Sequence, residues 1–385
     1  MSYADIIKKK QKEWDCPELL SKGVRGKKIP FSSPLMNWCT YGGIPRDMIT
    51  EFYGDFGSGK STTAQDVCKN AVEIFKNEYN EELADLREKL AAGDKSASDR
   101  IEELEEFGPK KVVYMDLEHT FDSEWAATLG LDADDIDVWQ PPNVVAEDVL
   151  QTVIEMIESG EVGLIVLDSV PSLVPRTVLE KKLGERTVAA LAGLLTTFMV
   201  KVIPLLTRYK CSLLNINQIR DNLDNPYEVN TPGGKAAKFY SALRMRFRIG
   251  NPVDFLGNAL PKNTENPAGY LITARITKQK SAPMDRKLAT YYLMCQSGIR
   301  PDFDYVALAV KNYGIIKKAA AWFSICDPYT GEVLIDSTTE KPVKLNGLGK
   351  VYDYLAANTE YYEKLKKFIT DDINNKGVVD LGASD

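Results

Sequence analysis

Histidine is nearly absent from this chain, and cysteine is sparse. The one histidine among 385 residues is His119, so neither a histidine-based metal site nor a catalytic triad is expected. The six cysteines are scattered, and none belongs to a C-x-x-C pair. Their spacing argues against a zinc site and against a disulfide framework.

Long apolar runs are also missing. No stretch of 18 uninterrupted apolar residues occurs, and the first ten residues hold no apolar segment before a cleavage site. We therefore expect no membrane span, no membrane partner and a cytoplasmic location. Hydrophobic residues make up 44% and charged residues 27% of the chain. This is an ordinary mixture for a soluble protein, whose length predicts two or three domains.

The chain has no excess of positive charge. Its net charge is −7 and its pI is about 5.2, so composition alone does not predict a nucleic-acid partner. That exclusion is weak, because a local basic surface can bind phosphates on a protein that is acidic overall.

A glycine-rich loop is the most informative feature that is present. It matches the G-x-x-x-x-G-K-S pattern with Gly54, Asp55, Phe56, Gly57, Ser58, Gly59, Lys60 and Ser61. A β-rich run, 48–53, precedes the loop, and a helical pattern that starts at Thr62 and ends at residue 75 follows it. In this context, backbone N–H groups and a helix N-terminus hold phosphate. The pattern predicts an ATP site in which Lys60 contacts the β- and γ-phosphates and Ser61 ligates Mg²⁺. We count Thr62 as part of this site.

Buried-strand runs alternate with helical patterns at 49–53, 111–116, 163–168 and 212–217. Three of these runs end in Asp116, Asp168 and Asn217. Polar residues at the carboxyl ends of parallel strands, beside a phosphate loop, are typical of the doubly wound arrangement. We therefore predict an α/β fold with a mostly parallel sheet flanked by helices.

Two acidic residues at strand ends are predicted to take part in the ATP site. Asp168 follows four apolar residues, as in a Walker-B strand, where the carboxylate holds Mg²⁺ through water. Glu118 comes just past the strand 111–116, where a carboxylate can orient the water that attacks the γ-phosphate. The alternative for Glu118 is a salt-bridged surface residue. The neighbouring His119 is expected only to hydrogen-bond within the site.

The segment 76–110 does not fit the alternation. Leucines recur at helical spacing before a Gly93-Asp94 turn, and Ile101, Leu104 and Phe107 recur after it. The spacing predicts a helical hairpin, and its many glutamates make it acidic. It is either a solvated surface excursion or a docking or regulatory element.

Five short motifs occur in a fixed order: GGIP at 42–45, DLEHTFD at 116–122, LDSV at 167–170, NINQIR at 215–220 and TPGGKAAKFY at 231–240. With them the chain resembles the bacterial and phage RecA-type homologous recombinases, over about residues 31–369. The pair NQIR and GGKAAKFY is the most specific part of the likeness. The resemblance implies a RecA-like P-loop NTPase core, a short N-terminal segment and a small α+β C-terminal domain.

The resemblance also implies how the chain is divided. Residues 1–30 would be an N-terminal oligomerisation segment, and 31–298 an ATPase core with DNA loops that carries the insertion 76–110. Residues 299–372 would be the small C-terminal domain, and 373–385 a disordered tail.

Members of this family form ATP-dependent helical filaments on single-stranded DNA and exchange strands with a homologous duplex. The resemblance implies that Gln218 senses the γ-phosphate and reports it to the DNA loops, and that Asp122 and Trp125 hold the adenine. It also implies that Lys278 and Lys280 reach across the filament interface to the ATP of the neighbouring subunit. Without the resemblance, these two lysines are simply an exposed basic turn.

Two loops, about 176–188 and 220–235, are expected to face DNA. Their candidate DNA-binding residues are Arg176, Lys181, Lys182, Arg186, Arg220, Tyr227, Gly233, Gly234 and Lys235. Tyr227 is also a candidate wedge between bases. The chain departs from the family pattern at Gly193, where a basic residue is usual, and in the acidic residues of the second loop. These departures predict a weaker or more salt-sensitive affinity for DNA.

Two other functions are compatible with the same ATPase core. A hexameric helicase or clock-type ATPase shares the P-loop but lacks NQIR followed by GGKAAKFY. A non-enzymatic DNA-binding paralogue would not need Lys60, Glu118 and Asp168, which are intact here. The preferred prediction is a DNA-dependent ATPase coupled to DNA strand exchange.

Overall fold

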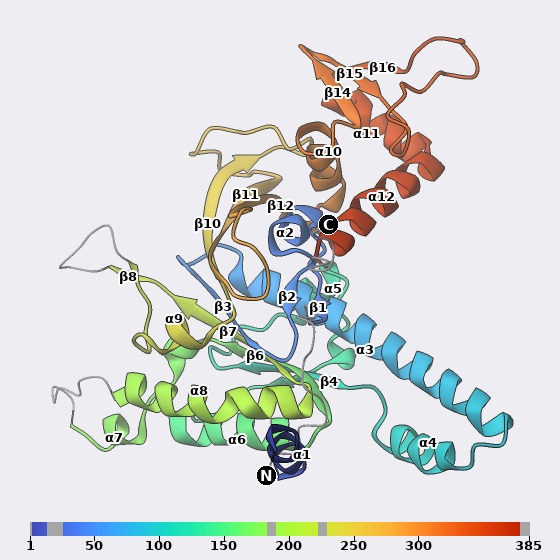
Figure 1. Ribbon diagram of the computed structural model, residues 1–385. Coiled ribbons are helices and arrows are strands. Elements are labelled where there is room, and N and C mark those ends of the chain that lie inside the picture. The colour runs from blue at the N-terminus through green and yellow to red at the C-terminus, as the bar shows by residue number, and fades with distance from the viewer. Residues whose placement is uncertain (1, 14–25, 183–189, 222–228, 378–385) are drawn as a thin grey trace.

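A nine-stranded sheet forms the centre of the molecule (Figure 1). The structure is a computed structural model that describes residues 2–13, 26–182, 190–221 and 229–377. The strand order is β13-β12-β11-β10-β3-β7-β6-β4-β5. The strands are β3 (Ile49–Gly54), β4 (Lys111–Asp116), β5 (Asp137–Trp139), β6 (Val162–Asp168), β7 (Ser212–Gln218), β10 (Leu243–Val253), β11 (Gly269–Gln279), β12 (Leu288–Met294) and β13 (Gly298–Ile299).

The sheet is mostly parallel. Strands β10, β3, β7, β6, β4 and β5 run parallel to one another, and β11, β12 and β13 continue from β10 as antiparallel strands. The carboxyl ends of β3, β4, β6 and β7 therefore meet at one edge, where a doubly wound sheet binds its ligand. The predicted α/β class is confirmed, and the four predicted strands agree with the observed ones to within one residue at each end.

Helices cover both faces of the sheet. On β4, Val112 and Tyr114 belong to the core beneath α2 (Pro34–Thr40) and α3 (Lys60–Ala91), whereas Val113 and Met115 belong to the core beneath α6 (Ala146–Glu158) and α8 (Ala190–Tyr209). Successive side chains of a strand point to opposite faces, so a strand buried on both sides is apolar throughout. This explains why the parallel strands could be recognised as continuous apolar runs.

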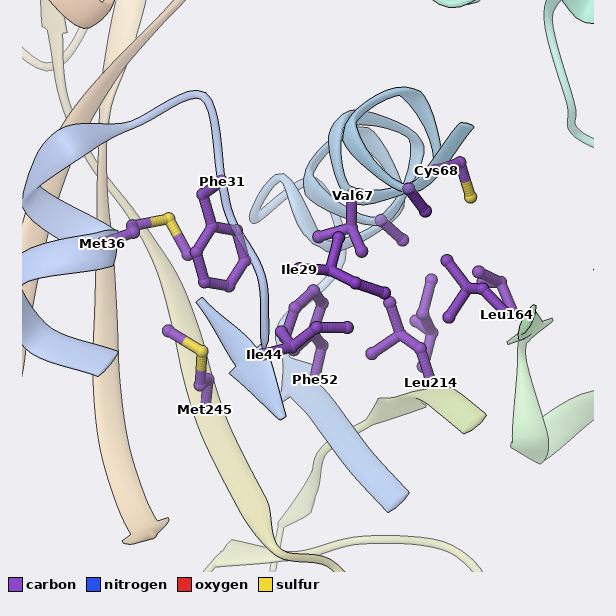
Figure 2. Close-up of a cluster of buried hydrophobic side chains, with 14 of the residues drawn as sticks. Ile29, Phe31, Met36, Ile44, Phe52, Val67, Cys68, Leu164, Leu214 and Met245 are labelled. Carbon is purple, nitrogen blue, oxygen red and sulfur yellow. The ribbon is translucent and has the colours of Figure 1, made fainter. Parts of the chain in front are cut away.

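The N-terminal segment contributes to the first of these cores. After α1 (Tyr3–Glu13), β1 (Lys28–Ile29) pairs with β2 (Ile44–Pro45). Ile29 is fully buried and shares a cluster with Phe52 and Val67, as Figure 2 shows. The core therefore begins before residue 31, the boundary predicted from the sequence.

Helix α8 is long and apolar enough to cross a membrane by length and composition alone. Its buried residues pack in the second core, among them Phe198, Met199 and Val202. A helix that packs on a protein core can pass the same test of composition, so this one helix is weak evidence for a membrane span.

The segment 76–110 forms the predicted helical hairpin, but its first arm is not a separate helix. Helix α3 starts at Lys60 rather than Thr62 and continues past residue 75 to Ala91, and α4 (Ser96–Phe107) returns alongside it. Leu83 and Ile101 are buried in the seam between them. Arg100 donates to Glu82 across the hairpin at 2.9 Å. The helix could extend because nothing between 75 and 91 breaks it: this stretch contains neither proline nor glycine.

The C-terminal part builds a third core. Helices α10 (Pro301–Lys311), α11 (Leu348–Ala357) and α12 (Thr359–Gly377) pack with a small sheet of β14 (Ile316–Ala319), β15 (Trp322–Ile325) and β16 (Lys344–Asn346). This arrangement confirms the small α+β C-terminal domain that the family resemblance implied. Ile373 is buried in α12, so the tail predicted from residue 373 begins too early; its last part, 378–385, lies outside the described residues.

Candidate nucleotide and DNA site

The glycine-rich loop lies at the carboxyl end of β3 and leads directly into α3. Gly59 has a φ of 82°, a left-handed conformation that glycine adopts without strain, and it caps α3. A Cβ at Gly54 would lie 2.2 Å from the backbone oxygen of Phe247, so glycine is required where the loop leaves the sheet. The Ser58 hydroxyl donates to the Asp55 carbonyl at 2.7 Å and closes the loop.

Lys60 folds back onto this loop. Its ammonium donates to the Asp55 carbonyl at 2.6 Å, and its side chain is almost completely buried. Burial lowers the pKa of Lys60, whereas the nearby charges of Asp168, Asp55 and Glu118 act in the opposite direction. A buried ammonium gains most from a strongly negative partner such as a phosphate group.

The carboxylate of Asp168 faces the start of α3 from the end of β6. It accepts hydrogen bonds from the Tyr114 hydroxyl at 2.6 Å and from the Ser61 hydroxyl. Burial raises the pKa of Asp168, and these two hydrogen bonds oppose that rise. A carboxylate beside a hydroxyl suits Mg²⁺, which keeps several waters and takes its other ligands from nucleotide phosphates. Within the described ranges no group of three or more His, Cys, Asp or Glu side chains is placed to hold a metal ion.

Glu118 and Gln218 are in direct contact. The Gln218 amide donates to Glu118 Oε1 at 3.1 Å, and the Ser169 hydroxyl donates to the same oxygen. The three residues come from the ends of β4, β6 and β7, which the parallel sheet places side by side. Glu118 is exposed and has these two polar partners, and within the described part of the chain no salt bridge joins it to a surface lysine or arginine. His119 lies 3.1 Å from the Pro141 carbonyl through Nε2 and is exposed.

The two residues expected at the adenine lie on α5 (Ser123–Thr128), beside the start of α3. Asp122 is the N-cap of α5 and accepts hydrogen bonds from the backbone N–H groups of Glu124 and Trp125. The Trp125 indole N–H donates to the Thr62 hydroxyl at 3.3 Å. Capping orients the helix that carries Trp125, so Asp122 has a structural task here whether or not it contacts a base.

Lys278 and Lys280 converge on the last turn of α9 (Ala236–Tyr240). Lys278 donates to the carbonyls of Lys238 and Phe239 at 2.6 and 2.7 Å, and Lys280 reaches the Phe239 carbonyl at 3.3 Å. Carbonyls at a helix C-terminus lack helical partners and attract cations. Partial burial, together with repulsion from Lys280, lowers the pKa of Lys278 to about 8.

The comparisons with known proteins all match the chain to the same family. The model of the RecA N-terminal domain matches residues 99–300. The chain is 30% identical over 331 residues to Protein RecA of Bacteroides thetaiotaomicron, covering 83% of this chain and 86% of that protein. It is 30% identical to Protein RecA of Clostridium acetobutylicum, covering 76% and 71%, and 32% identical to that of Chlorobaculum tepidum, covering 74% and 69%. The chain belongs to the RecA family.

The first DNA loop expected in this RecA-family chain is only partly described. Arg176 begins α7 (Arg176–Leu179), and its guanidinium donates to Asp148 of α6 at 2.6 Å. Lys181 and Lys182 follow and are exposed. Arg186 lies outside the described residues.

The second loop is described at its two ends. Arg220 belongs to β8 (Arg220–Asp221), which pairs with β9 (Val229–Asn230), whereas Tyr227 lies outside the described residues. Gly233 and Gly234 have φ angles of 85° and 71°. A Cβ at Gly233 would lie 2.4 Å from a side-chain carbon of Leu195 in α8. These glycines therefore let the loop return closely over α8 before the exposed Lys235.

The sequence did not predict which residues hydrogen-bond to the predicted site residues and orient them. Ser169 supports Glu118, and Tyr114 supports Asp168. Ser169 immediately follows the Walker-B aspartate, which was an available signal. Glu51 was another available signal, because it is the one charged residue of β3. The structure shows it fully buried, and a buried charge needs a partner.

Proposed function

We propose that this protein is an ATP-dependent DNA recombinase. It would form helical filaments on single-stranded DNA, hydrolyse ATP in response to DNA, and catalyse pairing and strand exchange with a homologous duplex. The observation that carries this proposal is the contact between Gln218 and Glu118 at 3.1 Å. Gln218 ends β7, and the second DNA loop begins two residues later, so one side chain connects the ATP site with the expected DNA site.

ATP hydrolysis would use the residues gathered at the sheet edge. Lys60 would exchange the Asp55 carbonyl for the β- and γ-phosphates. Ser61 and Asp168 would hold Mg²⁺, the aspartate through water, and the ion would neutralise phosphate charge. Glu118 would orient the attacking water once Gln218 leaves it for the γ-phosphate. Asp122 and Trp125 would bound the adenine, with the indole ring stacking on the base.

The assembly would complete the site. In the free chain, Lys278 and Lys280 are held by carbonyls of α9, which lies just after the second loop. In a filament they would turn to the ATP of the adjacent subunit and act as arginine fingers do in other P-loop enzymes. Hydrolysis would then depend on assembly, and assembly on DNA.

The charge distribution supports a DNA partner in spite of the acidic composition. Residues 77–107 carry 4 of the 48 basic and 11 of the 55 acidic side chains, so their net charge of −7 equals that of the whole chain. In Figure 1 this hairpin, α3 and α4, projects on the side opposite α7 and β8, the described elements that border the two expected DNA loops. The remainder of the chain is neutral and can present a local basic surface to DNA. Cytoplasmic location is part of the proposal.

Electron microscopy and a strand-exchange assay test this function together. With a slowly hydrolysed ATP analogue and single-stranded DNA, open helical filaments are expected, and these filaments should exchange a strand with a homologous duplex but not with an unrelated one. The second candidate, a hexameric helicase-type or other RecA-core ATPase, predicts closed rings and no homology-dependent exchange. That result would overturn the recombinase proposal and leave the ATPase core intact.

A further inference from the structure

One buried amide joins the strand that precedes the P-loop, the strand that ends in Gln218 and the far end of the second DNA loop. Asn217 is 1% exposed. Its Nδ2 donates to Glu51 Oε1 at 3.0 Å and to the Pro232 carbonyl at 3.1 Å, and its Oδ1 accepts the Gln218 backbone N–H at 3.0 Å. Among side chains of this length, only an asparagine amide offers two donors and an acceptor at once.

The first partner of this amide is itself fixed. Glu51 is fully buried on β3, three residues before the P-loop, and its other oxygen pairs with Arg244 of β10. The Arg244 guanidinium also lies 4.6 Å from the centroid of the Tyr53 ring. A buried carboxylate that is paired with an arginine is held in its orientation, because leaving either one alone would be costly. Asn217 therefore hydrogen-bonds to a rigid group on the P-loop strand.

The second partner is the root of the DNA loop. Pro232 precedes Gly233 and Gly234. These two glycines lie close to Leu195 and Ala192 of α8, so this end of the loop packs against α8. Helix α8 follows the first DNA loop in the chain. The carbonyl that Asn217 holds thus belongs to the segment on which both DNA loops converge.

We propose that Asn217 is a positioning residue that transmits the state of the ATP site to the second DNA loop. When Gln218 moves from Glu118 toward a γ-phosphate, its backbone N–H shifts the Asn217 amide, and the amide carries this shift to the Pro232 carbonyl. Glu51 and Arg244 serve as the fixed point against which the amide moves. The inference rests on the proposed function, since it requires ATP and DNA to bind cooperatively.

The test compares Asn217→Ala with Asn215→Ala. Both asparagines are buried on the same face of β7, but the described hydrogen bonds link only Asn217 to the loop root. The affinity for a labelled single-stranded oligonucleotide is measured at fixed salt, with and without a slowly hydrolysed ATP analogue. In Asn217→Ala the analogue should improve DNA affinity about tenfold less than in the parent, within the usual range of coupling between sites. Asn215→Ala should retain the parent ratio, and analogue affinity without DNA should change little in either variant.

The outcomes separate the two proposals. A parent whose DNA affinity does not respond to the analogue overturns the proposed function and, with it, this inference. A parent that responds, together with an Asn217→Ala variant that responds equally, overturns the inference alone. If Asn217→Ala does not fold, hydrogen exchange on the parent decides: the analogue without DNA should change the protection of the amides at 231 and 233–235. Unchanged protection there would refute the positioning role.

Discussion

Lys60 lies against the Asp55 carbonyl, and Asp168 lies against the Ser61 hydroxyl. Both charged groups therefore have polar neighbours in the same chain that a nucleotide and its metal ion can replace. Burial shifts both pKa values toward the neutral forms, down for Lys60 and up for Asp168. Phosphate would stabilise the charged form of Lys60 and Mg²⁺ that of Asp168, which favours binding of the two together.

Lys60→Ala tests the phosphate assignment. The variant removes the side-chain cation of the P-loop, and ATP turnover should fall by about 10²-fold or more, as when an oriented charge at a transition state is lost. Lys95→Ala, in the exposed turn of the hairpin, is the matched control and should keep parent activity. Normal ATP turnover by Lys60→Ala would remove the P-loop from the mechanism.

Glu118→Gln separates binding from hydrolysis. The amide keeps the size of the side chain but cannot act as a base, so turnover should fall by about 10²-fold while ATP binding and filament formation persist. Glu124→Gln, an exposed residue of α5, should change neither. Equal turnover in parent and Glu118→Gln, measured by phosphate release, would leave Glu118 a structural role only.

At the level of helices and strands, the sequence predicted some parts of the fold and of the site but not others. The P-loop and the Walker-B strand are local patterns, so Lys60, Ser61 and Asp168 were predicted with their elements. The small α+β C-terminal domain was expected only from the family resemblance, because β15 and β16 are short and their pairing joins residues about twenty positions apart. The partners of Glu118 could not be derived either, since they depend on which strand ends become neighbours. The Asp122 cap is local and was missed because the family likeness suggested an adenine contact instead.

The junction of α2 and α10 makes stability depend on pH. Asp304 of α10 is fully buried, accepts a hydrogen bond from the Ser33 hydroxyl, and has its pKa raised by burial to about 8. Its protonated form is therefore favoured on folding. That contribution is complete below the unfolded pKa of about 4 and is lost as pH rises to about 8.

Asp304→Asn removes this titration. Between pH 5 and pH 8 the Tm of the parent should fall relative to that of Asp304→Asn by about 5 °C, given a few kcal/mol of linkage at this chain length. Thermal unfolding followed by circular dichroism across that pH range measures the difference. A constant difference between the two Tm values would show that Asp304 does not titrate in this window.

At the scale of the whole molecule, the acidic hairpin of α3 and α4 projects on the side opposite α7 and β8, which border the loops proposed to bind DNA (Figure 1). The family likeness did not include this hairpin, and its seam is held by Leu83, Ile101 and the Arg100–Glu82 pair. It adds net negative charge on the side away from α7 and β8. The net charge of the whole chain therefore does not measure the charge around those two elements.

DNA-stimulated ATP hydrolysis should require lysines from a second subunit. A Lys278→Ala/Lys280→Ala variant should bind ATP but show no DNA-stimulated hydrolysis, because no cation reaches the neighbouring nucleotide. Mixed with Lys60→Ala subunits, it should regain part of the activity, since each mixed junction can combine an intact P-loop with intact lysines. If the two variants co-assemble, as judged by light scattering, and no activity returns, the lysines do not act across the interface.

The rate of ATP hydrolysis with and without single-stranded DNA tests the central claim most directly. At fixed salt and saturating Mg²⁺ and ATP, single-stranded DNA should raise the rate at least about tenfold, equivalent to about 1.4 kcal/mol of barrier. In the Glu118→Gln variant both the basal and the stimulated rate should be about 10²-fold lower. A parent rate that is the same with and without DNA, in protein that binds ATP, would contradict the proposal that this RecA-family chain couples ATP to DNA.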